Sequence, residues 1–290
     1  MPQSSYHAPE TVQQALALLA AHSHAKVMGG GTDLIVQMKS GRTAPAAVVD
    51  LKRIAGLSGV RALPGGGFAI GAATACTALK ADAALAAAWP GVVEAANLIG
   101  SVQVRNRATM AGNLCNASPA ADSVPALIAA GATVLVAGPA GERELAVGDL
   151  PQGPGRTALA AGEFVVEIRL PARPAGGGDA YLRSIPRTEM DIAVVGCGVA
   201  LVLDAGGVCT SARVALGAVA PTALLVEAAG AALVGTRLDA AVLDAMAETV
   251  RAACRPIADK RGTVEYRTAM AGVLAKRTVE IARQRAGGKA

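Results

Sequence analysis

Three consecutive glycines, Gly29–Gly31, precede Thr32 and Asp33 and stand between a predicted short strand at residues 26–28 and an apolar stretch that begins at Leu34 and predicts a helix. Backbone N–H groups in such a turn can converge on a pyrophosphate, and a helix amino end favours negative charge. A plain tight turn explains a glycine run equally well. A Rossmann G-x-G-x-x-G would need glycine at Leu34, and the Walker A sequence is absent.

A second candidate site is the polar segment 101–122, which is too long and too specific in composition to be a plain connector. Its small residues would let the backbone approach a ligand closely, while Asn113, Asn116 and Ser118 supply hydrogen-bonding groups. An Asx-rich surface turn is the alternative, which the length of the segment disfavours. The sequence therefore predicts a ligand site built from two loops.

Hydrophobic periodicity indicates the elements that would hold these loops. Pro and Gly concentrate in residues 171–179 without any period, which predicts a domain boundary there. The predicted strands are 26–28, 46–51, 68–72, 164–170, 180–185, 192–203 and 208–219, with a hairpin at 133–145; the predicted helices begin near residue 9 and at Leu34, and cover 77–88, 92–99, 124–130, 223–229, 238–252 and 264–283.

The composition agrees with a mixed fold. The chain of 290 residues can form two domains or three small ones, and its 52% hydrophobic but 2% aromatic content suits sheets flanked by helices, in an α/β or α+β class. The charge of +5 is spread along a chain with few aromatic residues, which argues against nucleic-acid binding. We expect a cytoplasmic protein, because its five cysteines are scattered, no apolar run is long enough to span a membrane, and the first residues lack a secretory pattern.

Several motifs in a fixed order carry a family resemblance. They are the glycine loop through Leu34 with Met38–Lys39, the run Val104–Leu114 with Ser118, Pro119 and Asp122, and Asp191–Val194. Together they resemble the flavin-binding subunits of the molybdenum hydroxylases, which include the medium subunit of bacterial carbon monoxide dehydrogenase and the FAD domain of xanthine dehydrogenases. The resemblance extends from Tyr6–Pro9 to Glu265–Thr268.

The resemblance implies an α+β fold. A two-part FAD-binding domain of the vanillyl-alcohol-oxidase (PCMH) type would be followed by a C-terminal domain with a small antiparallel sheet and a helical cluster. The two FAD-binding subdomains would cover residues 1–55 and 56–172, and the C-terminal domain would cover residues 179–290. FAD would lie between the two parts.

Motif matching also implies which residues contact the FAD. Lys26, Val27, Met28, Gly29, Gly30, Gly31, Thr32 and Asp33 would follow its adenosine diphosphate portion. Ile99, Thr109, Ala111, Gly112, Asn113, Asn116, Ser118 and Asp122 belong to the second loop and its surroundings, where the polar side chains would complete the pyrophosphate and ribityl cradle. Ile168, Leu170 and Arg183 would approach the isoalloxazine from the other side.

The chain departs from the family pattern at two of these positions. Ala111 stands where many relatives have glycine, so the loop would be strained if this position needs a positive φ. Asn116 replaces a common Thr or His, and its amide can still hydrogen-bond a phosphate oxygen.

The implied function is electron transfer without substrate chemistry. FAD would take electrons from [2Fe–2S] clusters of a small partner and pass them to an external acceptor, while a large molybdopterin-containing partner oxidises the substrate, in a dimer of heterotrimers. The alternatives are a stand-alone FAD-dependent oxidoreductase on the same fold and an assembly protein that has lost FAD.

No catalytic or metal-binding set can be assembled, because the chain's three histidines, the last being His24, all precede the first motif. Cys115 could approach the flavin, but a small buried thiol is the favoured interpretation. Asp191 fits either a cap or salt bridge or a group beside the flavin. Tyr266 and Arg267 are expected to pack between domains.

Overall fold

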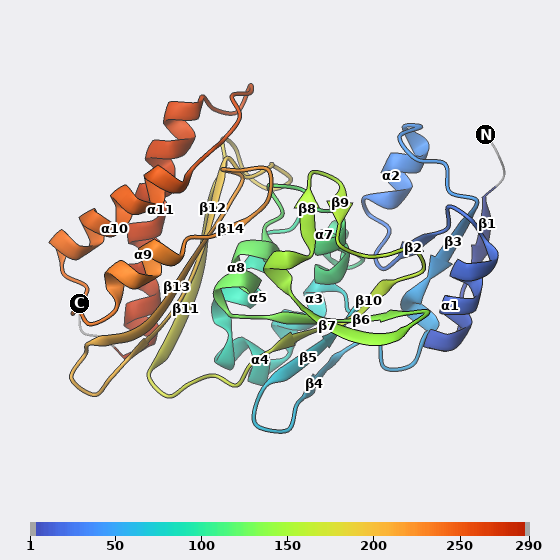
Figure 1. Ribbon diagram of the computed structural model, residues 1–290, viewed down its shortest axis with the longest axis horizontal. Helices are drawn as coiled ribbons and strands as arrows, with labels where there is room; N and C mark the ends of the chain where they lie inside the picture. Colours follow the sequence, from blue (N-terminus) through green and yellow to red (C-terminus); the bar gives the residue numbers. More distant parts are fainter. Residues whose placement is uncertain (1–3, 288–290) are drawn as a thin grey trace.

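A computed structural model describes residues 4–287, and a small parallel sheet opens the fold (Figure 1). Its order is β1-β3-β2, and both α1 and α2 belong to this N-terminal unit. Thr11 is the N-cap of α1, because its hydroxyl accepts a hydrogen bond from the Gln14 N–H at 3.1 Å. The elements are β1 (Ser5–His7), α1 (Val12–Ala21), β2 (Lys26–Met28), α2 (Leu34–Lys39), β3 (Ala47–Asp50) and the 3-10 turn η1 (Leu51–Arg53).

The middle unit is built on a five-stranded antiparallel sheet of order β4-β5-β10-β6-β7. β10 is the buried central strand and lies between β5 and β6 in the sheet. A long helical segment separates β5 from β6 in sequence. The strands are β4 (Val60–Ala62), β5 (Phe68–Gly71), β6 (Thr133–Gly138), β7 (Gly141–Ala146) and β10 (Phe164–Leu170), with a minor ribbon of β8 (Pro151–Gly153) and β9 (Arg156–Thr157) after the turn η2 (Val147–Asp149).

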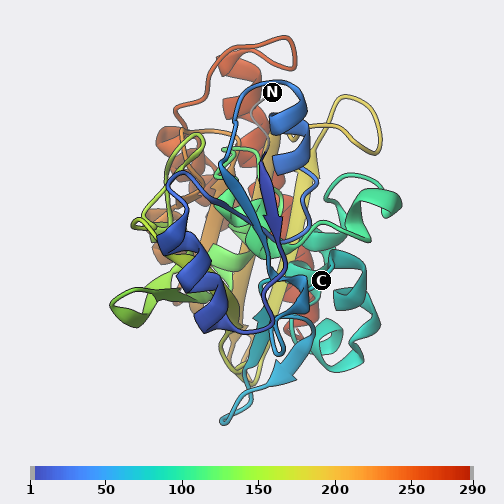
Figure 2. The same ribbon diagram turned by 90° about the vertical axis from the view of Figure 1, so that its right-hand side faces the viewer.

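Six helices of the middle unit lie between β5 and β6 in sequence, and the two cavities described below are lined partly from this region. They are α3 (Cys76–Ala81), α4 (Ala83–Ala88), α5 (Pro90–Asn97), α6 (Val102–Arg105), α7 (Met110–Cys115) and α8 (Ser123–Ala129). Figure 2 looks onto the N-terminal unit, with the middle unit behind it and the C-terminal unit at the back.

The C-terminal unit is a four-stranded antiparallel sheet of order β11-β12-β13-β14. Helices α9 and α11 cover one face of this sheet, while α5 and α8 of the middle unit contact the other face. The elements are β11 (Gly177–Ser184), β12 (Val195–Leu203), β13 (Cys209–Gly217), β14 (Leu224–Leu225), α9 (Glu227–Leu233), α10 (Ala240–Ala253) and α11 (Val264–Arg285).

The middle and C-terminal units meet at very close range. A Cβ atom added at Gly198 on β12 would lie 2.6 Å from the carbonyl oxygen of Pro125 in α8, so only glycine fits there. Arg285 of α11 also forms an ion pair with Glu94 of α5. Backbone packing and side-chain bonds thus join the two units.

The α+β class is as predicted, but several element boundaries were wrong. The predicted helix 77–88 is two helices, because Asp82 leaves the helical conformation and caps α4 by accepting from the Leu85 N–H at 2.9 Å. The predicted helix 223–229 begins instead with strand β14, and α9 starts at Glu227. Within residues 4–287 no helix is both long and apolar enough to cross a membrane. The division into domains at residues 55 and 172 stays a prediction.

Candidate cofactor site

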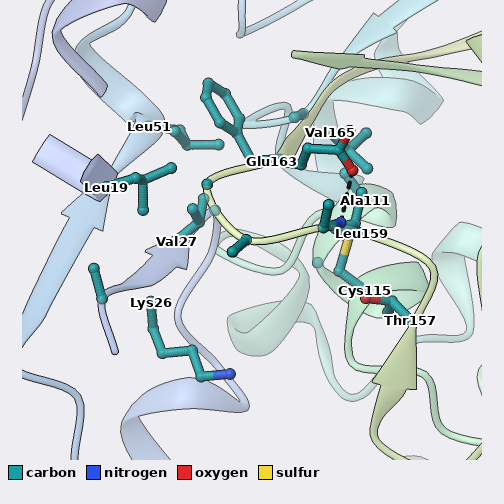
Figure 3. Close-up of a pocket in the computed structure, with 18 residues that line it drawn as sticks. Leu19, Lys26, Val27, Leu51, Ala111, Cys115, Thr157, Leu159, Glu163 and Val165 are labelled. Carbon is teal, nitrogen blue, oxygen red and sulfur yellow. Dashed lines mark hydrogen bonds between the residues drawn. The ribbon is translucent and has the colours of Figure 1, made fainter. Parts of the chain in front are cut away.

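Two adjoining cavities lie where the N-terminal unit meets the middle unit. The loop cavity, of about 220 Å³, is lined by the glycine loop, α2 and α7. The side cavity, of about 390 Å³, is lined by Leu19, Leu51 and the segment 157–165. Figure 3 shows Leu19 and Leu51 on one side of the side cavity, opposite Ala111 and Cys115. The cavities are continuous, because they share the lining residues Lys26, Val27, Gly29, Gly112 and Cys115.

Most of the predicted site residues are brought together in these cavities. The loop cavity is lined by Lys26, Val27, Met28, Gly29, Gly30, Gly31, Thr32, Asp33, Ile99, Thr109, Gly112, Asn113 and Asn116, and Ala111 lines the side cavity. The two candidate loops, about 80 residues apart in sequence, thus line the same cavity.

The glycine loop fits closely against the start of the second loop. A Cβ atom at Gly30 would lie only 2.0 Å from the carbonyl oxygen of Arg107, and Gly31 has φ +79°, where side chains are disfavoured. The glycines are therefore required both by the contact between the loops and by the backbone turn.

This turn leaves hydrogen-bond donors free. Among residues 4–287, the N–H groups of Gly30, Gly31, Thr32 and Asp33 donate to no protein acceptor. Backbone donors that line a cavity and lack protein partners are well suited to an anionic oxygen. A phosphate group fits this donor set.

The segment predicted as a single loop at residues 101–122 contains two short helices, α6 and α7. Thr109 caps α7 by accepting from the Gly112 N–H at 2.9 Å, and the Asn113 amide oxygen accepts from the Ser123 hydroxyl at 2.7 Å. These bonds orient the small residues of α7 along the cavity wall.

Ala111 lies inside α7 and does not have a positive φ. The positive φ that would have made its methyl group strain the loop is therefore not present. The left-handed residue of this loop is Ala117, with φ +49°. A side chain at position 111 is compatible with the backbone.

Comparisons with known proteins decide the family. Residues 2–173 match the family described as FAD binding domain in molybdopterin dehydrogenase, and residues 180–282 match the CO dehydrogenase flavoprotein C-terminal domain. The chain belongs to the FAD-binding family of molybdopterin dehydrogenases. The resemblance predicted from the motifs is thereby confirmed.

Relatives of this flavoprotein family align over nearly the whole chain. The carbon monoxide dehydrogenase medium chain of Afipia carboxidovorans is 39% identical over 97% of both chains, and the xanthine dehydrogenase FAD-binding subunit of Escherichia coli O157:H7 is 31% identical over 99% of this chain and 98% of its own. A reconstituted CO dehydrogenase structure from Oligotropha carboxidovorans superposes with a TM-score of 0.94 at 38% identity, covering 98% of this chain and 99% of that one. The predicted fold is confirmed by these similarities.

Five residues that were predicted to contact FAD line neither cavity. Ile168 and Leu170 are buried in the core of the β10 sheet, and Ser118 lies beyond α7. Asp122 and Arg183 form a buried ion pair at 2.7 Å. Their contact with FAD stays a prediction.

The Asp122–Arg183 pair is part of a larger polar cluster. Tyr181 donates to the second Asp122 oxygen at 3.0 Å. Burial raises the pKa of Asp122 to about 6, although Arg183 and the Tyr181 hydroxyl oppose this rise. The Arg183 Nε is buried and has no acceptor among the described residues.

The other single-residue predictions had mixed outcomes. Cys115 is half-buried and not fully buried as predicted, because it lines both cavities. Desolvation raises the pKa of its thiol to about 12, so it is neutral at pH 7. Asp191 accepts from Arg187 at 3.1 Å, which agrees with the salt-bridge interpretation. The interdomain packing predicted for Tyr266 and Arg267 is wrong. Tyr266 is exposed, and the Arg267 guanidinium donates to the carbonyl oxygen of Val194 at 2.7 Å, inside the C-terminal unit. Among the described residues, no group of three His, Cys, Asp or Glu side chains is placed to hold a metal ion.

Sequence reasoning missed two polar residues of the site, Gln37, which lines the loop cavity, and Lys52, which lines neither cavity. Gln37 of α2 donates to the amide oxygen of Asn116 at 2.9 Å and so joins the two loops. Lys52 donates to the carbonyl oxygen of Gly29 at 3.0 Å. Neither residue belongs to a motif with a recognised spacing, so only their positions in space indicate a role.

Proposed function

We propose that the chain holds FAD in the two adjoining cavities and relays electrons from an iron–sulfur partner to an external acceptor. The single observation that carries the proposal is the wall formed by both loops, with free N–H groups at Gly30, Gly31, Thr32 and Asp33. Family membership supports FAD as the ligand. When bound, FAD supplies the ability to accept and release electrons.

We assign the pyrophosphate to the loop cavity and an apolar ring to the side cavity. The loop cavity offers the free backbone donors, and Lys26 lines both cavities with a cationic side chain. The side cavity is lined by apolar groups such as Leu51, Leu159 and Phe164, which suit the faces of a flat ring such as adenine.

The residues of the chain bind and orient the cofactor, while substrate chemistry is assigned to a partner. The ionisable groups lining the cavities are Lys26, Asp33, Cys115 and Glu163. Of these, Cys115 is neutral and Glu163 is engaged by Arg143 at 2.8 Å. This leaves Lys26, whose cationic side chain suits an anionic phosphate, and Asp33, whose pKa is raised by burial. Family membership supports an electron-transfer subunit over a stand-alone oxidoreductase.

The partners are proposed to be a small [2Fe–2S] subunit and a large molybdopterin subunit, in a dimer of heterotrimers. An exposed apolar surface, which we call the apolar end, supports a docking site for the small subunit. It gathers Val102, Met190, Ile192, Ile257, Val264 and Tyr266 from α6, the β11–β12 loop, the α10–α11 loop and the start of α11. Contacts join these segments, since Arg105 of α6 pairs with Glu189 at 3.4 Å and Val194 lies beside Gly262. Both connecting loops project from the same end of the C-terminal unit, which is its upper end in Figure 1.

The apolar end is close to the cofactor site. Arg105 donates to the carbonyl oxygen of Ile99 at 3.2 Å, and Ile99 lines the loop cavity. An electron donor docked on this end would therefore lie near the bound cofactor. Large exposed apolar clusters of this kind mark interaction surfaces.

The test is to titrate the apoprotein with FAD and then to purify the native complex through a tag on this chain. We expect the protein to become yellow with about one FAD per chain, and we expect iron–sulfur and molybdenum subunits to co-purify. A protein that stays colourless after incubation with FAD would overturn the proposal. Flavin reduction by a small substrate without any partner would favour the stand-alone oxidoreductase.

A further inference from the structure

Lys52 contacts the glycine loop from outside the two cavities. Its Nζ donates to the carbonyl oxygen of Gly29 at 3.0 Å and pairs with Asp50 at 2.6 Å. Lys52 lines neither cavity, so it would not touch a ligand there.

The ammonium group is itself held in place. Asp50 is buried and accepts from the Tyr6 hydroxyl at 2.7 Å and from the Lys52 backbone N–H at 3.0 Å. Burial alone would raise the pKa of Asp50, but the hydrogen bonds from Lys52 and Tyr6 lower it, so the carboxylate stays ionised at neutral pH. Lys52 is thus fixed between a buried anion and the glycine loop.

The contact with Gly29 sets the direction of the next N–H group. In a planar trans peptide the carbonyl oxygen and the following N–H point in opposite directions. Because Lys52 holds the Gly29 oxygen on its own side, the Gly30 N–H points away from Lys52. Gly30 lines the loop cavity, and its N–H has no protein acceptor among residues 4–287.

Glycine peptides rotate easily, so this orientation needs an external restraint. The close contact between Gly30 and Arg107 restrains one end of the peptide, and Lys52 restrains the other. A donor oriented before binding spares the ligand the cost of ordering it.

We infer that Lys52 is a positioning residue, which orients the Gly30 N–H toward an oxygen of the FAD pyrophosphate. The inference rests on the proposed function. It concerns a residue outside the cavity, and the ligand chemistry is that of a diphosphate ester.

The test compares FAD binding by Lys52→Met with that by the wild type. We expect the Kd for FAD, measured by quenching of flavin fluorescence, to rise about tenfold, in line with the value of a hydrogen bond to a charged group. The rise should persist at 0.5 M salt, where the Debye length is only about 4 Å and the effect of a more distant charge is screened. Lys52→Arg, which keeps a cationic donor, should recover much of the affinity.

The control is Lys80→Met, because Lys80 lines a groove beside α5 and α11 and not the two cavities. It should bind FAD like the wild type. The melting temperature of each apoprotein shows whether the substitution acts through stability. If Lys52→Met does not fold, Lys52→Gln takes its place.

Three outcomes would overturn the inference. They are an unchanged Kd in Lys52→Met, a rise in Kd that disappears at 0.5 M salt, and a rise that only follows a lower apoprotein melting temperature. In each case the wild type still binds FAD and the proposed function stands. If the wild type itself does not bind FAD, the proposed function fails first.

Discussion

At Gly30 a single methyl group would separate the two loops of the site. Its Cβ would lie 2.0 Å from the Arg107 carbonyl oxygen, so the backbone of one of the two loops would have to move. We expect Gly30→Ala to lower the free energy of unfolding by about 1–3 kcal/mol through overpacking and to weaken FAD binding at least about tenfold. Urea denaturation and FAD titration measure the two effects.

Gly148→Ala is the matched control for this substitution. A Cβ there would meet Ile128 at an ordinary 3.7 Å, so stability and FAD affinity should change little. Equal effects of both substitutions would contradict the loop-contact argument.

The glycine loop and its free donors could be predicted from the sequence, because the run of glycines before Thr32 is itself the signal. The roles of Lys52 and Gln37 could not. Each acts through a contact between residues distant in sequence, 23 positions from Gly29 and 79 positions from Asn116, respectively. The backbone conformation of Ala111 could not be predicted either, because it depends on the helix α7 that the Thr109 cap begins.

Helices α2 and α7 are joined by the Gln37–Asn116 hydrogen bond across the loop cavity. We expect Gln37→Ala and Asn116→Ala each to weaken FAD binding several-fold, with a coupling energy of about 0.5–1.5 kcal/mol in a double-mutant cycle. The measurement is the Kd for FAD of the four proteins in the cycle.

The control cycle pairs Asn116→Ala with Gln13→Ala, on the exposed side of α1. These two changes should be additive. Additivity in the Gln37 cycle as well would show that the bond does not couple the helices during FAD binding.

Short elements were the ones that sequence patterns failed to predict. α6 and α7 have four and six residues and lie in a polar segment, where their caps at Ser101 and Thr109 resemble isolated turns. β1 has three residues and depends on parallel pairing with β3, about 40 positions later. Longer elements such as β10 and α11 bury enough apolar residues to show their period, and they were predicted closely.

The loop before α11 is held to it by the Asp259–Arg267 ion pair at 2.7 Å. The Arg261 N–H and the Arg267 guanidinium lower the pKa of Asp259 to about 2. Because the unfolded carboxyl has a pKa of about 3.9, the pair stabilises the fold above about pH 4, and this contribution is lost as the pH falls toward 2.

We therefore expect Asp259→Asn to be less stable than the wild type at pH 7, with a difference that shrinks as the pH falls below about 4. Urea denaturation at pH 7, 5 and 3.5 measures this difference. Asp149→Asn serves as the surface control. A difference that is the same at all three pH values would contradict the role of the ionised carboxylate.

On the scale of the whole molecule, the apolar end predicts where a partner binds. Met190 is 60% exposed and Ile257 is 71% exposed, and both should become buried in the complex. We expect the double variant Met190→Asp with Ile257→Asp to bind FAD normally but to co-purify with much less iron and molybdenum, because charges would enter an apolar contact. Metal analysis of the tagged complex gives the amounts of iron and molybdenum per chain.

Val234→Asp is the control for this experiment, since Val234 is 44% exposed at the end of α9 and outside the apolar end. Its metal content should match that of the wild type. Full retention of iron by the double variant would place the small subunit elsewhere.

The close contact between Gly198 and Pro125 also limits how this chain can be recombined with its relatives. The β11–β13 sheet is covered on one face by α9 and α11 and on the other by α5 and α8, so it forms the core of two units at once. A chimera joined at the linker near residue 173 would pack the β12 sheet of one protein against the α8 layer of another. A side chain in place of Gly198 would then clash with Pro125 and keep the two layers apart. Gene fusions and domain swaps should therefore succeed only when α8 and β12 are inherited as a pair.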